Sequence, residues 1–188
     1  MRRLKRGAMT MVEGGLAPDL EIDILVEAGD WRRSVPAASD LAHRAAQATI
    51  IDENMTGAAL ELSILLTDNA AIAALNSQWR GKSGPTNVLS FPAEMDAAQP
   101  PPAGAPVLLG DIAVALETLM TEAQDAGIAP EDHLRHLVVH GALHLCGYDH
   151  ENDADAERME GREIEILKAL GVSDPYAAAE RRLENTRS

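Results

Sequence analysis

The chain has 188 residues, of which 46% are hydrophobic, so it can bury one sizeable core without a second domain. A single cysteine excludes a disulfide framework and no apolar stretch is long enough to span a bilayer, so we expect a cytoplasmic protein without a membrane segment. The net charge of −14 arises from 16 basic and 30 acidic side chains, and such a surface repels polyanions over most of its area.

The two ends of the chain differ in composition from the rest. The start has no hydrophobic period, and it leads into polar residues and glycines rather than into the apolar core of a signal peptide. Four of the 16 basic side chains lie within the first six residues. We therefore expect a disordered basic extension over residues 1–15, one folded domain over residues 16–176, and a polar tail over residues 177–188.

Between these ends, the hydrophobic pattern alternates between the periods of strands and helices. In chain order we expect a strand at 19–27, a helix from a cap at Ser39 to residue 51, a strand at 60–66, a helix at 70–79 that starts after Thr67-Asp68-Asn69, strands at 86–91 and 107–115, and helices at 116–126, 130–146 and 154–170. The predicted class is α/β of the α+β type. It is a small mixed sheet of four strands, packed with about five helices around a central, buried helix that bears histidines.

The helix at 130–146 has the most informative pattern. Pro130 suits a first helical position, and Gly147 ends the helix. The apolar residues point in nearly every direction when wound at about 3.6 residues per turn, which predicts a helix that is buried on most sides. Buried imidazoles need polar partners, and a metal ion supplies one. Four histidines share one stripe of this helix, namely His133, His136, His140 and His144.

Three histidines have the spacing that a single divalent metal ion requires. His140 and His144 are four residues apart and share a helix face, and Gly147 lets the chain reverse so that His150 can return as a third ligand. Three nitrogen ligands leave a fourth position open, which is typical of a catalytic zinc site, and we expect one Zn²⁺ per chain. The alternative is that three unrelated histidines lie on a core helix.

The spacing HxxxHxxGxxH also matches the metal-binding half of the metzincin protease signature. In those proteases the residue after the first histidine is the glutamate that acts as general base, whereas this chain has Gly141 at that position. The metal geometry is therefore expected without the peptidase chemistry. The missing side chain of Gly141 is expected to leave room for a bulky phosphate beside the metal, and the general base stays unassigned.

The other histidines and the cysteine have different expected roles. We expect His136 to lie in the core or to orient a ligand, and His133 to lie near the helix start, with metal binding by the pair His136 and His140 as the alternative. His43 lies among alanines and arginines and is expected at the surface. Cys146 projects from the face opposite the ligands and is expected to be a small buried hydrophobe.

Three segments of the chain resemble the signatures of a known family. They are residues 136–150, residues 79–92 and residues 109–112. Together they resemble the YbeY family of bacterial metal-dependent endoribonucleases, and the resemblance extends over residues 19–176. It implies that the folded domain is a single zinc-dependent, single-strand-specific endoribonuclease domain. Its expected roles are maturation of the 3′ end of the small-subunit ribosomal RNA and ribosome quality control.

The chain departs from the family pattern at two places. Asn87 stands where the family commonly has an acidic residue, and Ser83-Gly84 replaces a more charged pair. Neither position is an expected metal ligand. These departures therefore bear on the preference for substrate rather than on the activity.

Arg80 is the second candidate for the active site. It lies beside Lys82 in a loop with Gly81 and Gly84, where it can offer paired hydrogen-bond donors to a phosphate while the glycines permit close backbone approach. The resemblance places this arginine at the active site as a catalytic residue, and we expect Lys82 to help bind the substrate. The alternative is an arginine at a helix end in water. Trp79 is expected to pack in the core.

Several carboxylates near the histidines have two possible roles. Asp111 and Asp149 can orient ligand histidines through the second ring nitrogen, or each can cap a turn. Glu151, Glu160 and Glu163 can move protons, but we expect most of them on a solvated helix face.

The acidic composition restricts how RNA can bind. Binding has to be local, in a cleft around the metal, Arg80 and Lys82, or guided by a protein partner. The resemblance implies ribosomal RNA and the ribosome as partners, with recruitment by small-subunit ribosomal proteins or a ribosome-assembly GTPase. The sequence leaves open whether the 2′-hydroxyl or a metal-activated water attacks. Two other classes also stay open, a metallopeptidase or other metal hydrolase, and a non-catalytic ribosome-assembly factor with a structural metal.

Overall fold

The computed structural model describes residues 19–55, 59–93, 102 and 105–177. The predicted extension over residues 1–15 and the predicted tail beyond Ala177 lie outside the described residues. None of the helices in the described part of the chain combines the length and the apolarity that crossing a bilayer requires. The elements are β1 (Leu20–Val26), α1 (Trp31–Ser34), α2 (Ala38–Asp52), β2 (Leu60–Thr67), α3 (Asn69–Arg80), β3 (Val88–Pro92), β4 (Val107–Ala115), α4 (Leu116–Ala126), α5 (Pro130–Leu145) and α6 (Asp153–Ala169).

The four strands form one mixed sheet in the order β1-β2-β4-β3. The pairs β1/β2 and β2/β4 are parallel, whereas β3 lies antiparallel to β4 at one edge. The predicted α+β class with a mixed four-stranded sheet is therefore confirmed. The short helix α1 was not predicted, because four residues are too few to show a helical period. It buries Trp31, whose Nε1 donates a hydrogen bond to the carbonyl of Thr67 over 3.0 Å.

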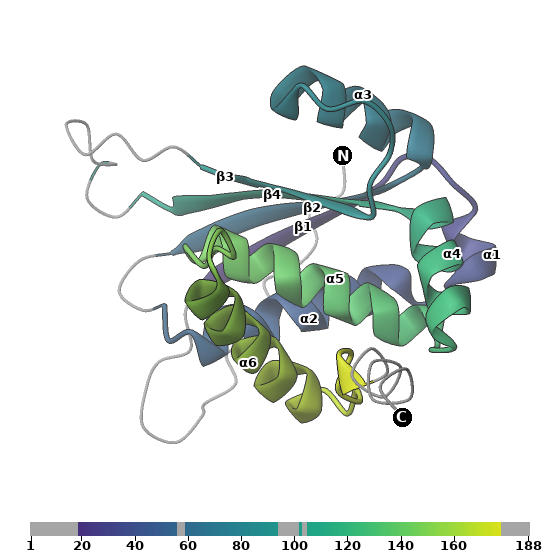
Figure 1. Cartoon of the computed structure of the whole chain (residues 1–188). Helices are drawn as coiled ribbons and strands as arrows, with labels where there is room; N and C mark the ends of the chain where they lie inside the picture. Colours follow the sequence, from purple (N-terminus) through teal and green to yellow (C-terminus); the bar gives the residue numbers. More distant parts are fainter. Residues whose placement is uncertain (1–18, 56–58, 94–101, 103–104, 178–188) are drawn as a thin grey trace.

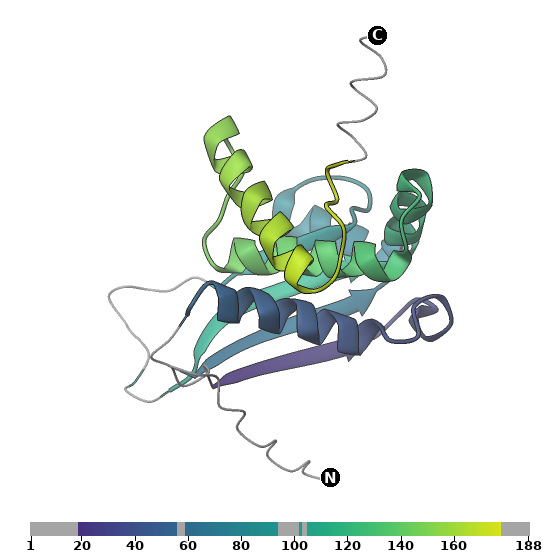
Figure 2. The same cartoon turned by 90° about the horizontal axis from the view of Figure 1, so that it is seen from below.

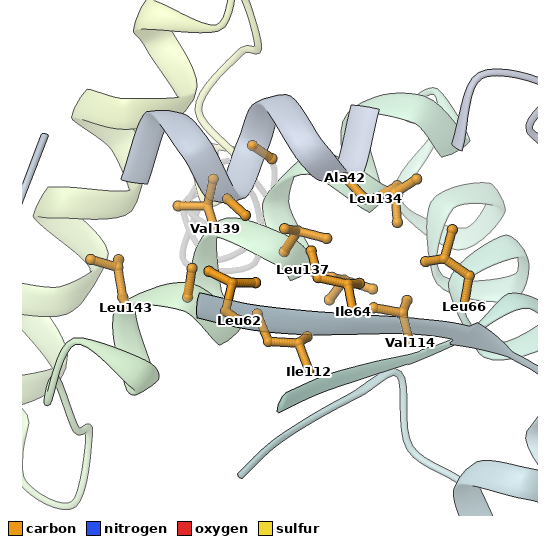
Figure 3. Packing of buried hydrophobic residues seen from close by; sticks show 14 of the residues in the cluster. Ala42, Leu62, Ile64, Leu66, Ile112, Val114, Leu134, Leu137, Val139 and Leu143 are labelled. Carbon is orange, nitrogen blue, oxygen red and sulfur yellow. The ribbon is translucent and has the colours of Figure 1, made fainter. Parts of the chain in front are cut away.

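The helices cover the two faces of the sheet unequally. Helices α2 and α5 pack side by side against one face, and α6 crosses α5 on the side away from the sheet (Figures 1 and 2). Helix α3 lies over the opposite face (Figure 1). The main core lies between the sheet and α2 and α5, where side chains from alternate strand positions meet the helices (Figure 3). It includes Ala42, Leu62, Ile64, Ile112, Val114, Leu137 and Leu143.

Helix α5 is the central element that the sequence predicted. Its buried residues lie on most of its sides, because it packs on α2, α4, α6 and the sheet at the same time. Val138, Val139 and Leu143 are completely buried. The position of its histidines is therefore set by the core packing of the whole helix.

The predicted starts of two helices had different outcomes, and of the segment Thr67-Asp68-Asn69 it is the aspartate that serves as the cap. Asp68 caps α3, since its Oδ1 accepts a hydrogen bond of 2.8 Å from the backbone N–H of Ala71. The prediction that Ser39 caps α2 is wrong, because the helix starts at Ala38 and its N-cap, Ala37, makes no side-chain cap hydrogen bond. The burial of Ala38 against the core, at 4% exposed, draws the helix start back past the serine.

Gly110 lies where the edge strand meets β4 after an irregularity in the pairing. Glu61 of β2 pairs with Leu108 of β4, but the next residue, Leu62, pairs with Gly110. The register of β4 therefore shifts by one residue just before Gly110. Gly110 has φ +133°, and an added Cβ would lie 2.2 Å from the carbonyl oxygen of Phe91. Because that oxygen belongs to backbone, it cannot move away without displacing β3.

We expect Gly110→Ala to destabilise the fold by about 1–3 kcal/mol through this backbone clash and the positive φ. The measurement is urea unfolding followed by circular dichroism. Gly161→Ala is the matched control, because its Cβ would meet nothing within 4 Å and alanine favours the helix by up to about 1 kcal/mol. Equal stability of Gly110→Ala and the wild type would contradict the proposed clash.

Candidate metal centre

Three imidazoles converge at the C-terminal end of α5. The candidate ligand atoms of His140, His144 and His150 all lie within 4.8 Å of one another, and the part of the chain that the structure describes holds no other such group of His, Cys, Asp or Glu side chains. His140 and His144 are half-buried, and His150 is exposed. The structure thus brings together the three histidines that the spacing singled out.

The turn after α5 brings the third histidine back to the first two. Gly147 adopts φ +91°, a left-handed conformation that favours glycine. The backbone N–H of Tyr148 donates to the carbonyl of Leu143, and that of Gly147 to the carbonyl of His144, each over 3.0 Å. This closing of the helix end directs the following residues back along α5. As a result, the ring of His150 lies 5.0 Å from that of His144, centroid to centroid.

The hydrogen bonds of His140 and His144 determine which ring nitrogen is free. The Nδ1 of His140 bonds the carboxylate of Glu163 over 2.8 Å, and the Nδ1 of His144 bonds the carbonyl of Tyr148 over 2.9 Å. Both partners are acceptors, so each Nδ1 carries the proton and each Nε2 presents a lone pair. Burial, followed by the nearby His140, lowers the pKa of His144 and keeps this ring neutral.

The two free nitrogens fit a metal ion. The Nε2 atoms of His140 and His144 lie 3.2 Å apart. Two nitrogen ligands of a tetrahedral zinc ion, each at about 2.0–2.1 Å, are separated by about 3.3 Å. Two lone pairs facing each other at this distance repel unless a cation lies between them. The donor set and its spacing are therefore those of a zinc-type site with an exposed third ligand.

Glu163, named from the sequence as a carboxylate that can move protons, has a buried role that the sequence analysis did not predict. Its side chain is 1% exposed and bonds His136 Nε2 and His140 Nδ1 over 2.8 Å each, as well as the hydroxyl of Tyr176. Burial alone would raise the pKa of this carboxyl, but the hydrogen bonds from the two histidines lower it to about 2. Glu163 is thus an ionised buried carboxylate, and the expectation of a solvated face is wrong for it.

A signal for Glu163 was present in the sequence. It lies on the buried stripe of α6 with Met159, Ile166 and Leu167, where a carboxylate interrupts an apolar period. A charge at such a position needs a partner inside the protein. Glu151 and Glu160, in contrast, are exposed, as expected.

His136 contacts Glu163 and lies outside the three-histidine group. Its Nε2 is bonded to that carboxylate, and its ring packs against Tyr176 with centroids 5.7 Å apart. This position agrees with the expected role of orienting a ligand. His133 lies one turn earlier and bonds Glu122 over 2.8 Å, and burial lowers its pKa.

The two aspartates do not orient a ligand imidazole. Asp111 is on β4 next to Ile112, and Ile112 faces α5, so Asp111 faces the opposite side of the sheet. The prediction that it orients a ligand histidine is therefore wrong. Asp149 accepts a hydrogen bond of 2.7 Å from the backbone N–H of His150. It fixes the turn before His150, which is the second role considered for it.

The structure explains the glycine at position 141 differently from the prediction. An added Cβ would lie 3.0 Å from Ile112 Cγ2 and 3.1 Å from Ser90 Oγ, so the glycine faces the sheet. The expectation that it leaves room beside the metal is wrong, because the missing side chain lets α5 approach β3 and β4 closely. Cys146 contacts Met55 sulfur to sulfur at 3.6 Å, and burial raises its pKa to about 12, so it is a poor thiolate ligand.

Arg80 is the last residue of α3 and reaches the edge strand beside α5. Its Nη2 donates to the carbonyl of Ser90 over 3.1 Å, and Ser90 Oγ lies against Gly141, the neighbour of His140. Arg80 is exposed, and apart from the bond to Ser90 the described residues offer its guanidinium no hydrogen-bond partner. Lys82 is also exposed, in the loop that follows.

A second concave region lies on the other face of the sheet, beneath α3. This cleft has a volume of about 680 Å³, and the described residues that line it include carboxylates but no lysine or arginine. Trp79 forms part of its wall and is 65% exposed, so the prediction that it packs in the core is wrong. Because α3 covers only part of the sheet, its last turn projects this ring into solvent. The residues that characterise the cleft are Asp23, Leu25, Glu27, Leu75, Trp79 and Asp111.

Comparison with known proteins agrees with this geometry. Residues 26–171 match the family model described as Endoribonuclease YbeY. The chain is 52% identical over 158 residues to a protein of Rhodospirillum rubrum named Endoribonuclease YbeY, covering 80% of this chain and 78% of that one. A protein of the same name from Azorhizobium caulinodans is 51% identical over 161 residues, covering 84% and 97% of the two chains.

The fold has a solved counterpart. The solution structure of TM1509 from Thermotoga maritima superimposes with a TM-score of 0.50 at 24% identity, covering 89% of this chain and 95% of that chain. This likeness concerns the fold alone. Family membership comes from the matched model, which spans most of the chain, and from relatives that are about 50% identical over their aligned residues. The chain therefore belongs to the Endoribonuclease YbeY family.

Proposed function

We propose that the protein is a zinc-dependent endoribonuclease that cleaves single-stranded RNA in the cytoplasm. Its proposed roles are maturation of the small-subunit ribosomal RNA 3′ end and ribosome quality control. The observation that carries the proposal is the convergence of His140, His144 and His150, with two of the rings held by hydrogen bonds at Nδ1, in a member of a family named for this activity. The fourth position of a three-histidine site is open to substrate.

The residues around the site have different proposed roles. His140, His144 and His150 would hold the ion, and zinc, when bound, supplies Lewis acidity for phosphodiester cleavage. Glu163 keeps the proton on His140 Nδ1 and so directs Nε2 toward the ion. Arg80 presents free donors to a phosphate oxygen and offsets negative charge that develops during cleavage.

The electrostatics favour a local contact with RNA. The net charge is −14, and the cleft beneath α3 is lined by carboxylates. Arg80 and Lys82 are the exposed basic side chains that follow one another at the end of α3. We therefore expect RNA to approach the histidine side of the molecule and to bind weakly in the absence of a partner.

The first prediction concerns the ligands. The variants His140→Ala, His144→Ala and His150→Ala should each lose most of the bound zinc, because one of three ligands is removed. His43→Ala and Cys146→Ala should retain it. Zinc content is measured by atomic emission after dialysis, and full occupancy in His150→Ala would contradict the assignment of the third ligand.

The same samples separate the competing functions. Zinc-loaded protein should cleave single-stranded RNA faster than structured RNA and should leave casein intact, with His144→Ala as the control for contaminating nuclease. Casein cleavage would favour a metallopeptidase. Melting of the fold on zinc removal, without turnover of any RNA, would favour an assembly factor with a structural metal.

The second prediction isolates Arg80. Arg80→Ala should lower the rate of RNA cleavage by about a hundredfold or more, since one contact to the charged transition state is lost. The cleavage rate of Arg80→Lys should lie between those of Arg80→Ala and the wild type, because lysine keeps the charge without the paired donors. Zinc content and Tm should stay near wild type in both. Cleavage by Arg80→Ala at the wild-type rate would show that the arginine only ends the helix.

The cleft beneath α3 supports a protein partner. Three of its carboxylates lie beside two exposed apolar side chains, Leu25 at 54% and Trp79 at 65%. Such a surface matches a basic segment with apolar or cationic side chains that can pack on the indole ring. We propose that a basic small-subunit ribosomal protein docks here, while a ribosome-assembly GTPase stays a second partner implied by the family resemblance.

The third prediction tests this surface. Asp111→Lys should weaken binding of a purified basic small-subunit ribosomal protein by about tenfold or more, because it places a positive charge in the acidic cleft. Glu157→Lys on α6 makes the same charge change on an exposed position outside the cleft and should have little effect. Binding is measured by titration calorimetry at two salt concentrations. Equal losses in both variants would show that only net charge matters.

A further inference from the structure

We infer that Glu53 and Arg162 are positioning residues for the metal ligand His144, acting through Tyr148. This inference rests on the metal site of the proposed function and is independent of the RNA substrate. Hydrogen bonds at the backbone and at the side chain of Tyr148 carry it. His144 Nδ1 donates to the carbonyl of Tyr148 over 2.9 Å, and the hydroxyl of Tyr148 donates to Glu53 Oε2 over 3.0 Å. Arg162 Nε and Nη2 then donate to Glu53 Oε1, over 3.0 Å each.

These hydrogen bonds hold Tyr148 at its backbone carbonyl and at its side-chain hydroxyl. Its backbone determines the proton position on His144, and its side chain is anchored to the end of α2. His150 follows two residues later in the same turn. The anchoring of Tyr148 therefore restricts the paths of both His144 and His150 toward His140. Without it, the turn would keep Gly147, the backbone bonds of the helix end, the Asp149 bond and the contact of Arg158 with the Tyr148 ring, but Tyr148 would lose its hydrogen bond to Glu53.

Arg162 makes this anchor electrostatically possible. Asp52 is the last residue of α2 and Glu53 is its C-cap, so two carboxylates lie at the negative end of the helix dipole. Arg162 donates to both, as well as to Glu165. The Glu53 side chain is only 14% exposed, so solvent screens its charge poorly. The acidic neighbours raise the pKa of Arg162, although its partial burial by itself acts in the opposite direction.

Helix α6 reaches both ligands on α5 through consecutive residues. Glu163 bonds His140 directly, and Arg162, the preceding residue, reaches His144 through Glu53 and Tyr148. Helix α6 can do this because it packs against both α5 and α2. The Nε2 atoms of His140 and His144 lie 3.2 Å apart, and their orientation thus depends on how α6 packs against α5 and α2.

A merely structural role is the alternative, in which this network only joins α2 to α6. The two roles differ in what the variants change. A structural link affects the free energy of unfolding, whereas a positioning role changes the affinity and the geometry of a bound ion. Tyr148→Phe is the sharpest variant, because it removes one hydroxyl and keeps the ring and the carbonyl that His144 uses.

The experiment measures zinc affinity by chelator competition and the visible absorption of the Co²⁺-loaded protein. We expect Tyr148→Phe and Glu53→Gln each to weaken zinc binding by about tenfold and to alter the cobalt d–d bands, since outer hydrogen bonds of ligands have effects of about 10–100-fold. Arg162→Ala should do the same, and Arg162→Lys should restore part of the affinity. Arg135→Ala is the matched control, because Arg135 is similarly exposed and pairs only with Asp132 in the contacts described here.

The outcomes separate this inference from the proposed function. Unchanged zinc affinity and unchanged cobalt spectra in Tyr148→Phe and Glu53→Gln would overturn it, whatever happens to Tm. If Arg162→Ala does not fold, these two variants still decide the question. A wild-type protein that binds both ions but does not cleave RNA would refute only the proposed function. A wild-type protein that binds neither ion would refute both.

Discussion

The site depends on one buried charge, the carboxylate of Glu163. An ionised group that is 1% exposed is stable inside a protein only when hydrogen bonds replace its lost hydration. Here two imidazoles and the hydroxyl of Tyr176 supply those bonds. The carboxylate in return fixes the ring of His140 and joins α5, α6 and the segment after α6. Two of the four histidines on the polar stripe of α5, His136 and His140, are thereby paired inside the protein.

Placing the ligands on α5 combines rigidity with access. The helix is held by core packing on several sides, so His140 and His144 have little freedom, whereas His150 comes from the turn that follows and remains exposed. Two ligands on a rigid element and one on a loop allow the site to be preorganised and still open to a large substrate. Gly141 contributes by letting α5 approach β3 and β4 closely, and the carbonyl of Ser90 on β3 accepts a hydrogen bond from Arg80.

The two faces of the sheet carry different chemistry. One face is covered by α2 and α5 and leads to the histidines, while the other is partly open beneath α3 and is lined with carboxylates (Figure 1). A protein with a net charge of −14 cannot attract RNA over its whole surface. The acidic cleft and the histidine-bearing helix α5 lie on opposite faces of the sheet. An acidic face is at the same time suited to basic proteins.

The sequence by itself determined the class of fold, the central helix and the three converging histidines. These follow from local rules: the hydrophobic period of α5, a spacing of four residues on one helix face, and a glycine that ends the helix. Asp68 as a cap follows from the same kind of rule. Each depends on residues that are near neighbours in the chain, so no knowledge of packing is needed.

Only the tertiary structure decided which polar residues share a site. Glu163 is 23 residues from His140, and Glu53 is 95 residues from Tyr148, so no local spacing connects them. The side of the sheet on which Asp111 lies, the exposure of Trp79 and the contact of Gly141 with Ile112 depend likewise on which helix covers which face. These features were assigned differently from the sequence, because a residue type and its period indicate burial but do not identify the partner. That choice is made when distant segments pack against one another.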